Sequence, residues 1–340
     1  MLSKPVGIML ELRDNHGRPL NYLRLAIIDR CNLRCFYCMP EEGIKYMQRE
    51  ELLSYEEMER LITVMAGMGV DKVRITGGEP FLRKDLMTFL KTIRNIKGIE
   101  QINITTNGVY TKEYIDELKA LDITNINLSL DTLDKEKFFK MTRRDAFDEV
   151  MSTFHALLAE GFNVKINAVA VSEQSEEDIY QLGMLSRDYP VSVRFIEEMP
   201  FNGQSNELQT IQWTYKNIHK LFHDRVPGLS LLKAKPSSTS TEYSADGHKG
   251  TIGIIPAYSR TFCGQCNRIR ITARGMLKTC LYDEGVLDIK HMLRAGISET
   301  NLKKALMGAF NSRAKDGFEA ESRNAKDKGG ASESMSMIGG

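Results

Sequence analysis

The sequence has no long apolar run, almost no net charge and only six cysteines among its 340 residues. A membrane-spanning helix needs about 20 consecutive apolar residues, and no stretch approaches that length. The formal net charge of +1 gives no bulk electrostatic reason to expect binding to nucleic acid or to an anionic membrane. The composition is that of an ordinary soluble globular protein, so we expect neither nucleic acid nor a membrane as a partner.

The first twelve residues resemble neither a secretory signal nor an arginine-rich transit peptide. They contain Lys4 and Glu11 and are interrupted by Pro5 and Gly7. We therefore expect the protein to stay in the compartment where it is made, a cytoplasm of the bacterial type. The chain length is a weak indication of two domains.

The six cysteines fall into two groups of three. Cys31, Cys35 and Cys38, the first cysteine triad, have C-x3-C-x2-C spacing and follow the strand-like residues 22–28. In a large chain with no export signal, such cysteines indicate metal binding or catalysis rather than disulfides. A closed zinc site needs four protein ligands. Three thiolates on a 4Fe–4S cluster leave one iron open to bind and activate another molecule.

Cys263, Cys266 and Cys280 form the second cysteine triad. It also offers three thiols rather than four. A zinc site that borrows its fourth ligand from elsewhere is the alternative interpretation at each triad. Because the three-thiol pattern occurs twice, the zinc interpretation is weakened at both places.

Strand-like and helix-like segments alternate from residue 21 to about residue 200, which predicts an α/β fold with parallel strands. The expected strands are residues 22–28, 72–76, 101–105, 125–130, 163–171 and 191–196. The expected helices are residues 54–68, 85–96, 111–120, 146–160 and 175–188.

Each strand alternates polar and apolar residues, as Lys72, Arg74 and Thr76 alternate with Val73 and Ile75. Period two places the polar set on one face of the sheet. A closed eight-stranded barrel would fill its interior with branched aliphatic side chains. The alternative, a sheet with one face in solvent, is unusual because parallel sheets are normally covered on both faces. We therefore predict a partial (β/α)6 TIM-type barrel around a polar ligand chamber, closed by a C-terminal domain that carries the second triad.

The remaining segments complete the expected organisation. We expect a helical linker at residues 201–227 with the single Trp213, a variable surface loop at 235–249, a strand at 269–272, a helix at 301–313 and a flexible polar chain beyond 316. The expected division is an N-terminal extension (1–20), the partial barrel (21–225), a C-terminal domain with the second cluster and the substrate site (226–320) and a flexible tail ending in Gly-Gly (321–340).

Two sets of residues in this sequence resemble motifs of the radical S-adenosylmethionine enzymes. They are Cys31-x3-Cys35-x2-Cys38 with Tyr37, and Gly77-Gly78-Glu79-Pro80 after the next strand. In that superfamily three cysteines hold a 4Fe–4S cluster, whose open iron binds S-adenosylmethionine. One electron from the cluster then cleaves the sulfonium and releases a 5′-deoxyadenosyl radical.

The second triad narrows the resemblance to the GTP 3′,8-cyclase family, over residues 17–340. The residues that do so are Asn267-Arg268-Ile269-Arg270 and the final Gly339-Gly340. This implies a lyase with two 4Fe–4S clusters that converts GTP to (8S)-3′,8-cyclo-7,8-dihydroguanosine 5′-triphosphate, the first step of molybdenum cofactor biosynthesis. It also implies an external one-electron donor, a homodimer and hand-over of product to cyclic pyranopterin monophosphate synthase.

The resemblance assigns roles by position. The two triads would hold the two clusters, and Tyr37, Gly78, Ser129 and Met199 would contact S-adenosylmethionine, Tyr37 through its backbone. The GTP contacts would be Arg24, Lys72, Arg74, Thr105, Lys165, Arg194, Arg268 and Arg270. Arg268, Arg270, Gly339 and Gly340 would be the catalytic residues.

Charge supports the GTP assignment independently of the resemblance. Cations inside a barrel are costly unless they meet anions, and a triphosphate supplies anions. The cations on strands are Arg24, Lys72, Arg74, Lys165 and Arg194. The alternative is salt bridges to acidic residues such as Glu79 or Glu198. Glu79 itself could hold the cofactor amino group indirectly or brace its own turn.

Two rival functions remain open at this point. One is another radical S-adenosylmethionine enzyme with auxiliary clusters, such as a peptide-maturing enzyme, although those usually carry more cysteines in their C-terminal part. The other is a binding module with two zinc ions and no catalytic activity. Iron and sulfide analysis separates the second from any cluster enzyme.

Overall fold

The computed structural model describes residues 11–199 and 211–325, whose strands form one twelve-stranded sheet. The strand order is β12-β11-β10-β1-β2-β3-β4-β5-β6-β9-β8-β7, so the sheet has two open ends. From β10 to β9 all neighbouring strands are parallel. These parallel strands are β1 (Tyr22–Ala26), β2 (Lys72–Thr76), β3 (Gln101–Thr106), β4 (Asn125–Ser129), β5 (Asn163–Ala170), β6 (Ser192–Glu197), β9 (Thr251–Ile255) and β10 (Arg268–Ile271).

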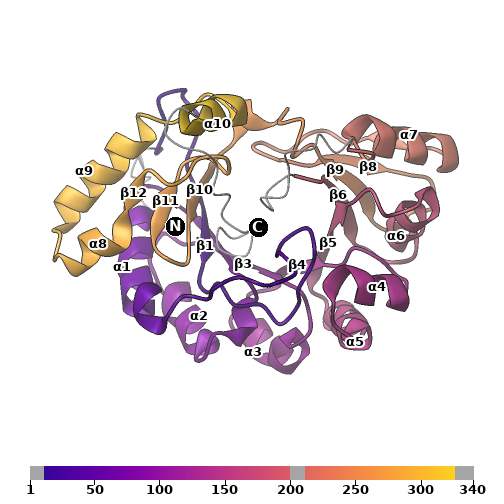
Figure 1. The fold of residues 1–340 in the computed structure, drawn as a ribbon, viewed down its shortest axis with the longest axis horizontal. Helices are drawn as coiled ribbons and strands as arrows, with labels where there is room; N and C mark the ends of the chain where they lie inside the picture. The colour runs from indigo at the N-terminus through magenta and orange to yellow at the C-terminus, as the bar shows by residue number, and fades with distance from the viewer. Residues whose placement is uncertain (1–10, 200–210, 326–340) are drawn as a thin grey trace, which may run out of the picture.

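Short antiparallel strands extend both ends of the parallel sheet. β11 (Met276–Lys278) and β12 (Leu287–Asp288) lie outside β10, and β8 (Thr241–Ser244) and β7 (Ser230–Leu231) lie outside β9. The sheet curves round a central space without closing (Figure 1). The prediction of a partial TIM-type barrel is therefore confirmed, and the parallel sheet gains two strands from the C-terminal part of the chain.

Helices cover the outer side of the curved sheet (Figure 1). The helices of the described residues are α1 (Tyr55–Ala66), α2 (Leu86–Arg94), α3 (Ile115–Ala120), α4 (Lys135–Thr142), α5 (Phe147–Ala159), α6 (Glu176–Asp188), α7 (Tyr215–Arg225), α8 (Ile289–Arg294), α9 (Glu299–Phe310) and α10 (Gly317–Ala325). Four 3-10 turns also occur, η1 (Arg49–Glu51), η2 (Pro80–Leu82), η3 (Thr111–Tyr114) and η4 (Cys263–Gln265). Within the described residues no helix combines the length and apolarity that crossing a membrane requires.

The core lies between the apolar strand faces and the helices. Leu23, Val73 and Ile104 are fully buried there, as expected for the apolar set of each strand. Burying this face removes apolar surface from water and stabilises the sheet against the helices. The polar set of each strand is thereby turned to the opposite, inner side.

Two expectations about the later part of the chain need correction, and some helices were not expected. Residues 317–325, expected to be flexible, form α10, which is fixed by an ion pair between the buried Arg260 and Glu321 at 2.9 Å. Residues 235–249 are not only a surface loop, because they include β8. α4 and α8 were not expected at all. The domain bounds given above stay predictions.

Candidate active site

A large cavity of about 1580 Å³ opens on the polar side of the sheet. Pockets for a single small ligand usually measure roughly 300–1000 Å³, so this cavity has room for two ligands. Its lining includes the first cysteine triad and all of the expected GTP and S-adenosylmethionine contacts. These contacts are Arg24, Tyr37, Lys72, Arg74, Gly78, Thr105, Ser129, Lys165, Arg194, Met199, Arg268 and Arg270.

The first cysteine triad lies in the loop after β1 and is held against the end of α4. The backbone N–H of Arg34 donates to the carbonyl of Thr142 at 2.8 Å, and that of Phe36 donates to the carbonyl of Met141 at 3.1 Å. All six cysteines lie in the described residues, and none is joined in a disulfide. The unexpected helix α4 therefore has a clear local role, because it fixes the cysteine loop.

The thiol geometry bears on the zinc alternative. In the described segments, 11–199 and 211–325, no three His, Cys, Asp or Glu side chains converge closely enough to bind a single metal ion. The first triad does place three thiols on the wall of one cavity. A 4Fe–4S cluster binds each thiolate through a different iron, so three thiols would leave one iron open toward that cavity.

The pKa values of the thiols differ with their surroundings. Burial, with help from the carboxylate of Glu79, raises the pKa of Cys31 to about 11. Burial raises the pKa of Cys280 to about 11 as well. Such thiols stay protonated at neutral pH on their own, whereas coordination to a metal deprotonates a thiol outright. Burial opposes ionisation of Cys266 too, but Arg268 and Arg313 outweigh it and lower its pKa to about 7.

The Gly77-Gly78-Glu79-Pro80 turn packs directly on the segment that leads into the first triad. The N–H of Gly78 donates to the carbonyl of Ile28 at 2.7 Å. A Cβ on Gly78 would lie 2.2 Å from the carbonyl oxygen of Arg30, so no other residue fits. Gly78 also lines the large cavity. The close approach of the two loops therefore requires glycine here, in addition to any contact with a cofactor.

Glu79 braces this turn, which was one of the two roles left open for it. Its carboxylate is buried and accepts hydrogen bonds from the N–H of Phe81 at 3.2 Å and the hydroxyl of Thr106 at 2.9 Å. It also accepts from the N–H of Asn107 at 2.7 Å. The side-chain amide of Asn107 in turn lies 3.6 Å from the sulfur of Cys31. Glu79 thus holds the residue that contacts the first triad.

Glu79→Ala is expected to lower the free energy of unfolding by about 3 kcal/mol, because three buried donors lose their acceptor. Urea unfolding of the iron-free protein measures this change. Glu79→Gln keeps one acceptor oxygen and should lose less. An alanine variant as stable as the parent would contradict the bracing role.

The raised pKa of Glu79 predicts that the stability of the protein depends on pH. Burial raises the pKa of Glu79 to about 7 against the opposing effect of its hydrogen bonds. Between its ordinary range and pH 7 the folded protein then holds a proton that the unfolded chain has lost. Stability should therefore fall as pH rises through this window. Glu79→Gln should remove that part of the slope in unfolding curves measured from pH 5 to pH 8.

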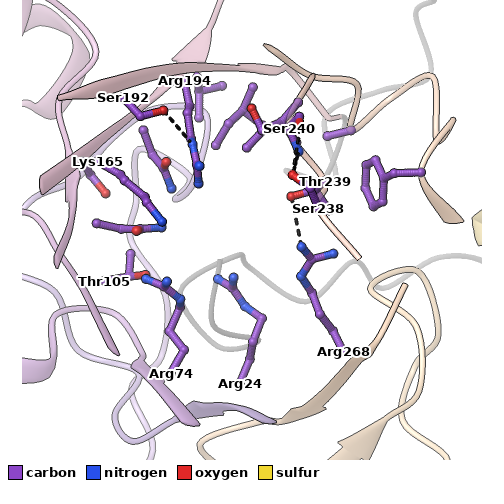
Figure 2. A pocket seen from close by; sticks show the side chains of 18 of the residues that line it. Arg24, Arg74, Thr105, Lys165, Ser192, Arg194, Ser238, Thr239, Ser240 and Arg268 are labelled. Atoms are coloured by element: carbon purple, nitrogen blue, oxygen red, sulfur yellow. Dashed lines mark hydrogen bonds between the residues drawn. The ribbon is translucent and has the colours of Figure 1, made fainter. Parts of the chain in front are cut away.

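Cations from separate strands project into one space. Figure 2 shows Arg24, Arg74, Lys165 and Arg268 pointing into the cavity from different parts of the sheet, with Thr105 beside Arg74. Arg74 donates to the hydroxyl of Thr105 at 3.3 Å. The parallel pairing of β1 with β2 sets Arg24 opposite Arg74, and all four cations line the same cavity, so their charges act on one volume.

The positive charge of this cluster shifts the pKa values of two neighbouring groups, Tyr22 and Lys165. Burial opposes ionisation of the Tyr22 phenol, yet Arg74, Arg24 and Arg268 outweigh it and lower its pKa to about 7. Burial, Arg194 and other nearby cations lower the pKa of Lys165 to about 8. A wall that stabilises a phenolate and disfavours a further cation carries a surplus of positive charge. Such a wall suits a polyanionic ligand.

Arg194 has a carboxylate partner within the protein. Its guanidinium pairs with Glu242 at 2.7 Å and donates to the hydroxyl of Ser192 at 3.1 Å. The salt-bridge alternative therefore describes this cation, although the partner is neither Glu79 nor Glu198. Arg194 still lines the cavity, and its contact with GTP stays a prediction.

Sequence reasoning missed the contribution of residues 231–242 to the site. This segment lines the cavity, so the expectation of a surface excursion is wrong for residues 235–242. Arg268 donates to the hydroxyl of Thr239 at 3.0 Å, and Ser238 donates to the carbonyl of Ser240 at 2.8 Å (Figure 2). The hydroxyl-rich run at 237–241 was the available signal, since such groups suit polar ligands as well as loops.

The expected cofactor contacts lie on another part of the same wall. The hydroxyl of Tyr37 donates to Asp131 at 2.7 Å, and Asp131 also accepts from the N–H of Val169 at 2.9 Å. Burial raises the pKa of Asp131 to about 6. Asp131 is thus a buried anchor for the cysteine loop. Gly339 and Gly340 lie outside the described residues.

The second cysteine triad lines a separate small cavity of about 50 Å³ beside β10. Cys263 and its neighbours form η4, and Cys280 follows β11. Arg268 and Arg270 line both cavities, so the two spaces share a wall. A group bound by the second triad would therefore lie next to the ligand in the large cavity.

Comparison with known proteins gives the family of this chain. The family described as "Radical SAM superfamily" matches residues 25–183, and "Molybdenum Cofactor Synthesis C" matches residues 191–318. The barrel and first triad thus define a radical S-adenosylmethionine protein. "GTP 3′,8-cyclase" of Desulforamulus reducens is 38% identical over 87% of this chain and 92% of that protein. The chain belongs to the GTP 3′,8-cyclase family.

Other relatives differ in length. "GTP 3′,8-cyclase, mitochondrial" of Arabidopsis thaliana is 36% identical over 92% of this chain and 80% of that protein. "Molybdenum cofactor biosynthesis protein moc-5" of Caenorhabditis elegans is 39% identical over 88% of this chain but only 50% of that protein. The chain thus spans about half the length of several curated relatives that it matches. Streptococcus suis SuiB bound to S-adenosylmethionine shares the fold, with a TM-score of 0.56 and 18% identity over 87% of this chain and 69% of that chain.

Proposed function

We propose that this chain is a radical S-adenosylmethionine GTP 3′,8-cyclase. It converts GTP to (8S)-3′,8-cyclo-7,8-dihydroguanosine 5′-triphosphate for molybdenum cofactor biosynthesis. The observation that carries the proposal is one cavity lined both by the first cysteine triad and by strand cations, next to a second triad. Membership of the family implies two 4Fe–4S clusters and S-adenosylmethionine as cofactors.

On the cofactor side, Cys31, Cys35 and Cys38 hold the first cluster. When bound, this cluster supplies the electron that cleaves S-adenosylmethionine reductively. Gly78 leaves the strand edge open on the cavity side, and Asp131 fixes the ring of Tyr37 so that the cysteine loop keeps its position. Ser129 and Met199 contact the remainder of the cofactor. A preformed, partly enclosed wall keeps water from the reactive centre.

On the substrate side, Lys72, Arg74 and Lys165 bind the triphosphate, with Thr105 as a hydrogen-bonding partner. Holding the triphosphate in place would restrict the orientation of the ribose, so the part of these residues would be to position the substrate. Arg268 and Arg270 lie between the cavity and the second triad, where they contact the guanine end of the nucleotide. The 3′ hydrogen would pass to the 5′-deoxyadenosyl radical to give 5′-deoxyadenosine, and the carbon radical left at C3′ would add to C8 of the base. One electron from the external donor and one proton would then complete the 7,8-dihydro product. A catalytic part for Gly339 and Gly340 belongs to the same proposal.

The proposal extends to the partners expected from the sequence. They are an external one-electron donor, a second copy of the chain in a homodimer, and cyclic pyranopterin monophosphate synthase as the next enzyme. A cytoplasmic location, and the division at residues 225 and 226 into a barrel and a C-terminal domain, also remain proposals.

The test is an anaerobic assay of the reconstituted protein with dithionite and S-adenosylmethionine. We expect GTP to stimulate formation of 5′-deoxyadenosine strongly and to be consumed, whereas ATP at the same concentration should not. If GTP does not change the cleavage of S-adenosylmethionine, the chain is a radical enzyme but not the cyclase. A peptide substrate would then be tested. A protein that binds zinc but neither iron nor sulfide would contradict the enzyme interpretation.

A further inference from the structure

A buried ionic network lies behind the second cysteine triad and has no part in the steps described above. The carboxylate of Asp14 accepts from Nε of Arg18 at 2.6 Å and from Nη1 of Arg313 at 3.1 Å. The side chains are 0%, 6% and 3% exposed respectively. Two arginines and one carboxylate leave an excess positive charge in a buried place, which is costly unless another group needs it.

Both arginines reach the chain around the second triad. Arg18 donates through Nη1 to the carbonyl of Cys263 at 3.0 Å. Arg313 donates through Nη1 to the carbonyl of Cys266 at 2.9 Å and through Nε to the carbonyl of Thr279 at 2.8 Å, next to Cys280. The two guanidinium groups thus hold the backbone at or beside each cysteine of the triad.

Arg313 also contacts a sulfur directly. Its Nη2 lies 3.3 Å from Sγ of Cys266 and donates to the carbonyl of Arg268 at 3.0 Å. Hydrogen bonds to cluster sulfurs and nearby charge help to set the reduction potential of an iron–sulfur centre. A cation at this place stabilises the more negative, reduced state and therefore raises the potential.

We propose that Asp14, Arg18 and Arg313 form a positioning network for the second cysteine triad, and that Arg313 sets the reduction potential of the cluster bound there. This inference rests on the proposed function, which supplies the cluster. Asp14 aligns both guanidinium groups, so the turn at residues 12–20 contributes to this site. Apolar side chains could fill the same volume, but they could not donate to these four carbonyl groups and the sulfur.

The experiment is a redox titration monitored by electron paramagnetic resonance on the reconstituted full-length chain. The parent chain carries Cys31→Ala, Cys35→Ala and Cys38→Ala, so that only the second cluster gives a signal. Arg313→Gln in this parent is expected to move the midpoint potential to a more negative value. Asp14→Asn, which leaves the charge of Arg313 less compensated, should move it the opposite way. Arg187→Gln is the matched control, since Arg187 is exposed and pairs with Asp188 at 2.9 Å.

Opposite shifts in the two variants would support the inference, because general loosening of the site would not give opposite signs. A retained cluster with an unchanged potential in Arg313→Gln would overturn it. If Arg313→Gln cannot retain the cluster, Arg313→Lys is measured instead. Recovery of cluster content in Arg313→Lys would support the need for a cation, and equal loss in both would contradict it. A parent chain that binds no second cluster would overturn the proposed function itself.

Discussion

Cys263→Ala is expected to abolish formation of the cyclised nucleotide while part of the S-adenosylmethionine cleavage remains. Cys263 lines the small cavity with the second triad and is absent from the lining of the large one. The loop of the first triad is held by separate contacts, through Arg34 and Phe36 to the end of α4. Removing one of three thiols at the second site should therefore leave the first site intact.

The expected loss of product exceeds about 100-fold, because substitution of residues that merely support a metal ligand already costs roughly 10–100-fold. Product and 5′-deoxyadenosine are quantified in the same anaerobic reaction by mass spectrometry. Cys35→Ala is the matched control and should lose both activities. Product at the parent level in Cys263→Ala would exclude any role of the second triad in cyclisation.

The six expected strands were predictable because two signals coincide in them. Period-two alternation marks both the strand and its buried face, and residues such as Val73 and Ile126 are indeed fully buried. β9 lacks this alternation and contains Gly253. A Cβ on Gly253 would lie 2.5 Å from Oγ of Ser240 and 2.9 Å from Cγ of Arg194, so its identity is set by packing across the sheet. No local pattern reveals that contact.

Two of the three missed helices, α4 and α10, have weak local signals. In α4 the adjacent Phe138 and Phe139 are 3% and 53% exposed, so the apolar residues do not outline a clear face. In α10 the guanidinium of Arg260 lies 4.4 Å from the ring centroid of Phe318 and also pairs with Glu321. Short helices depend on such tertiary contacts more than on intrinsic propensity. These two helices are therefore stabilised by contacts that form only in the folded protein.

The site was predictable where the residue type itself carries the chemistry. Thiols at regular spacing and cations on polar strand faces fall into this class, and the structure places them round adjoining cavities. The partner of Arg194 was not predictable, because Glu242 lies on a later antiparallel strand. The contact of Arg313 with Asp14 likewise joins opposite ends of the chain. Long-range pairs of this kind depend on the topology, and no regular spacing in the sequence indicates them.

Lys165→Ala is expected to weaken GTP binding by about 2 kcal/mol, roughly 30-fold in Kd, since a charge-assisted hydrogen bond to phosphate is lost. Binding of S-adenosylmethionine should change far less. Calorimetry with each ligand under anaerobic, non-reducing conditions measures both affinities. Lys112→Ala is the matched control, because this exposed lysine donates to Ser152 on the surface. Equal losses for both ligands would contradict the phosphate role.

The pH dependence sharpens this prediction. Burial and neighbouring cations, Arg194 first among them, lower the pKa of Lys165 to about 8. GTP affinity of the parent should therefore fall as pH rises through about 8, because above it a proton must be taken up for Lys165 to meet a phosphate. The alanine variant should lose that part of the dependence.

The free energy of unfolding of the ligand-free protein should change with pH in the opposite direction to the GTP affinity. A depressed lysine pKa means that the unfolded chain holds a proton that the folded chain releases, so the parent gains stability as pH rises above about 8. At neutral pH the charge of Lys165 opposes folding, and the alanine variant should be no less stable in urea apart from the lost packing of its side-chain stem. A substitution that weakens substrate binding yet spares the ligand-free protein is the signature expected of a cation placed for a polyanion rather than for the fold.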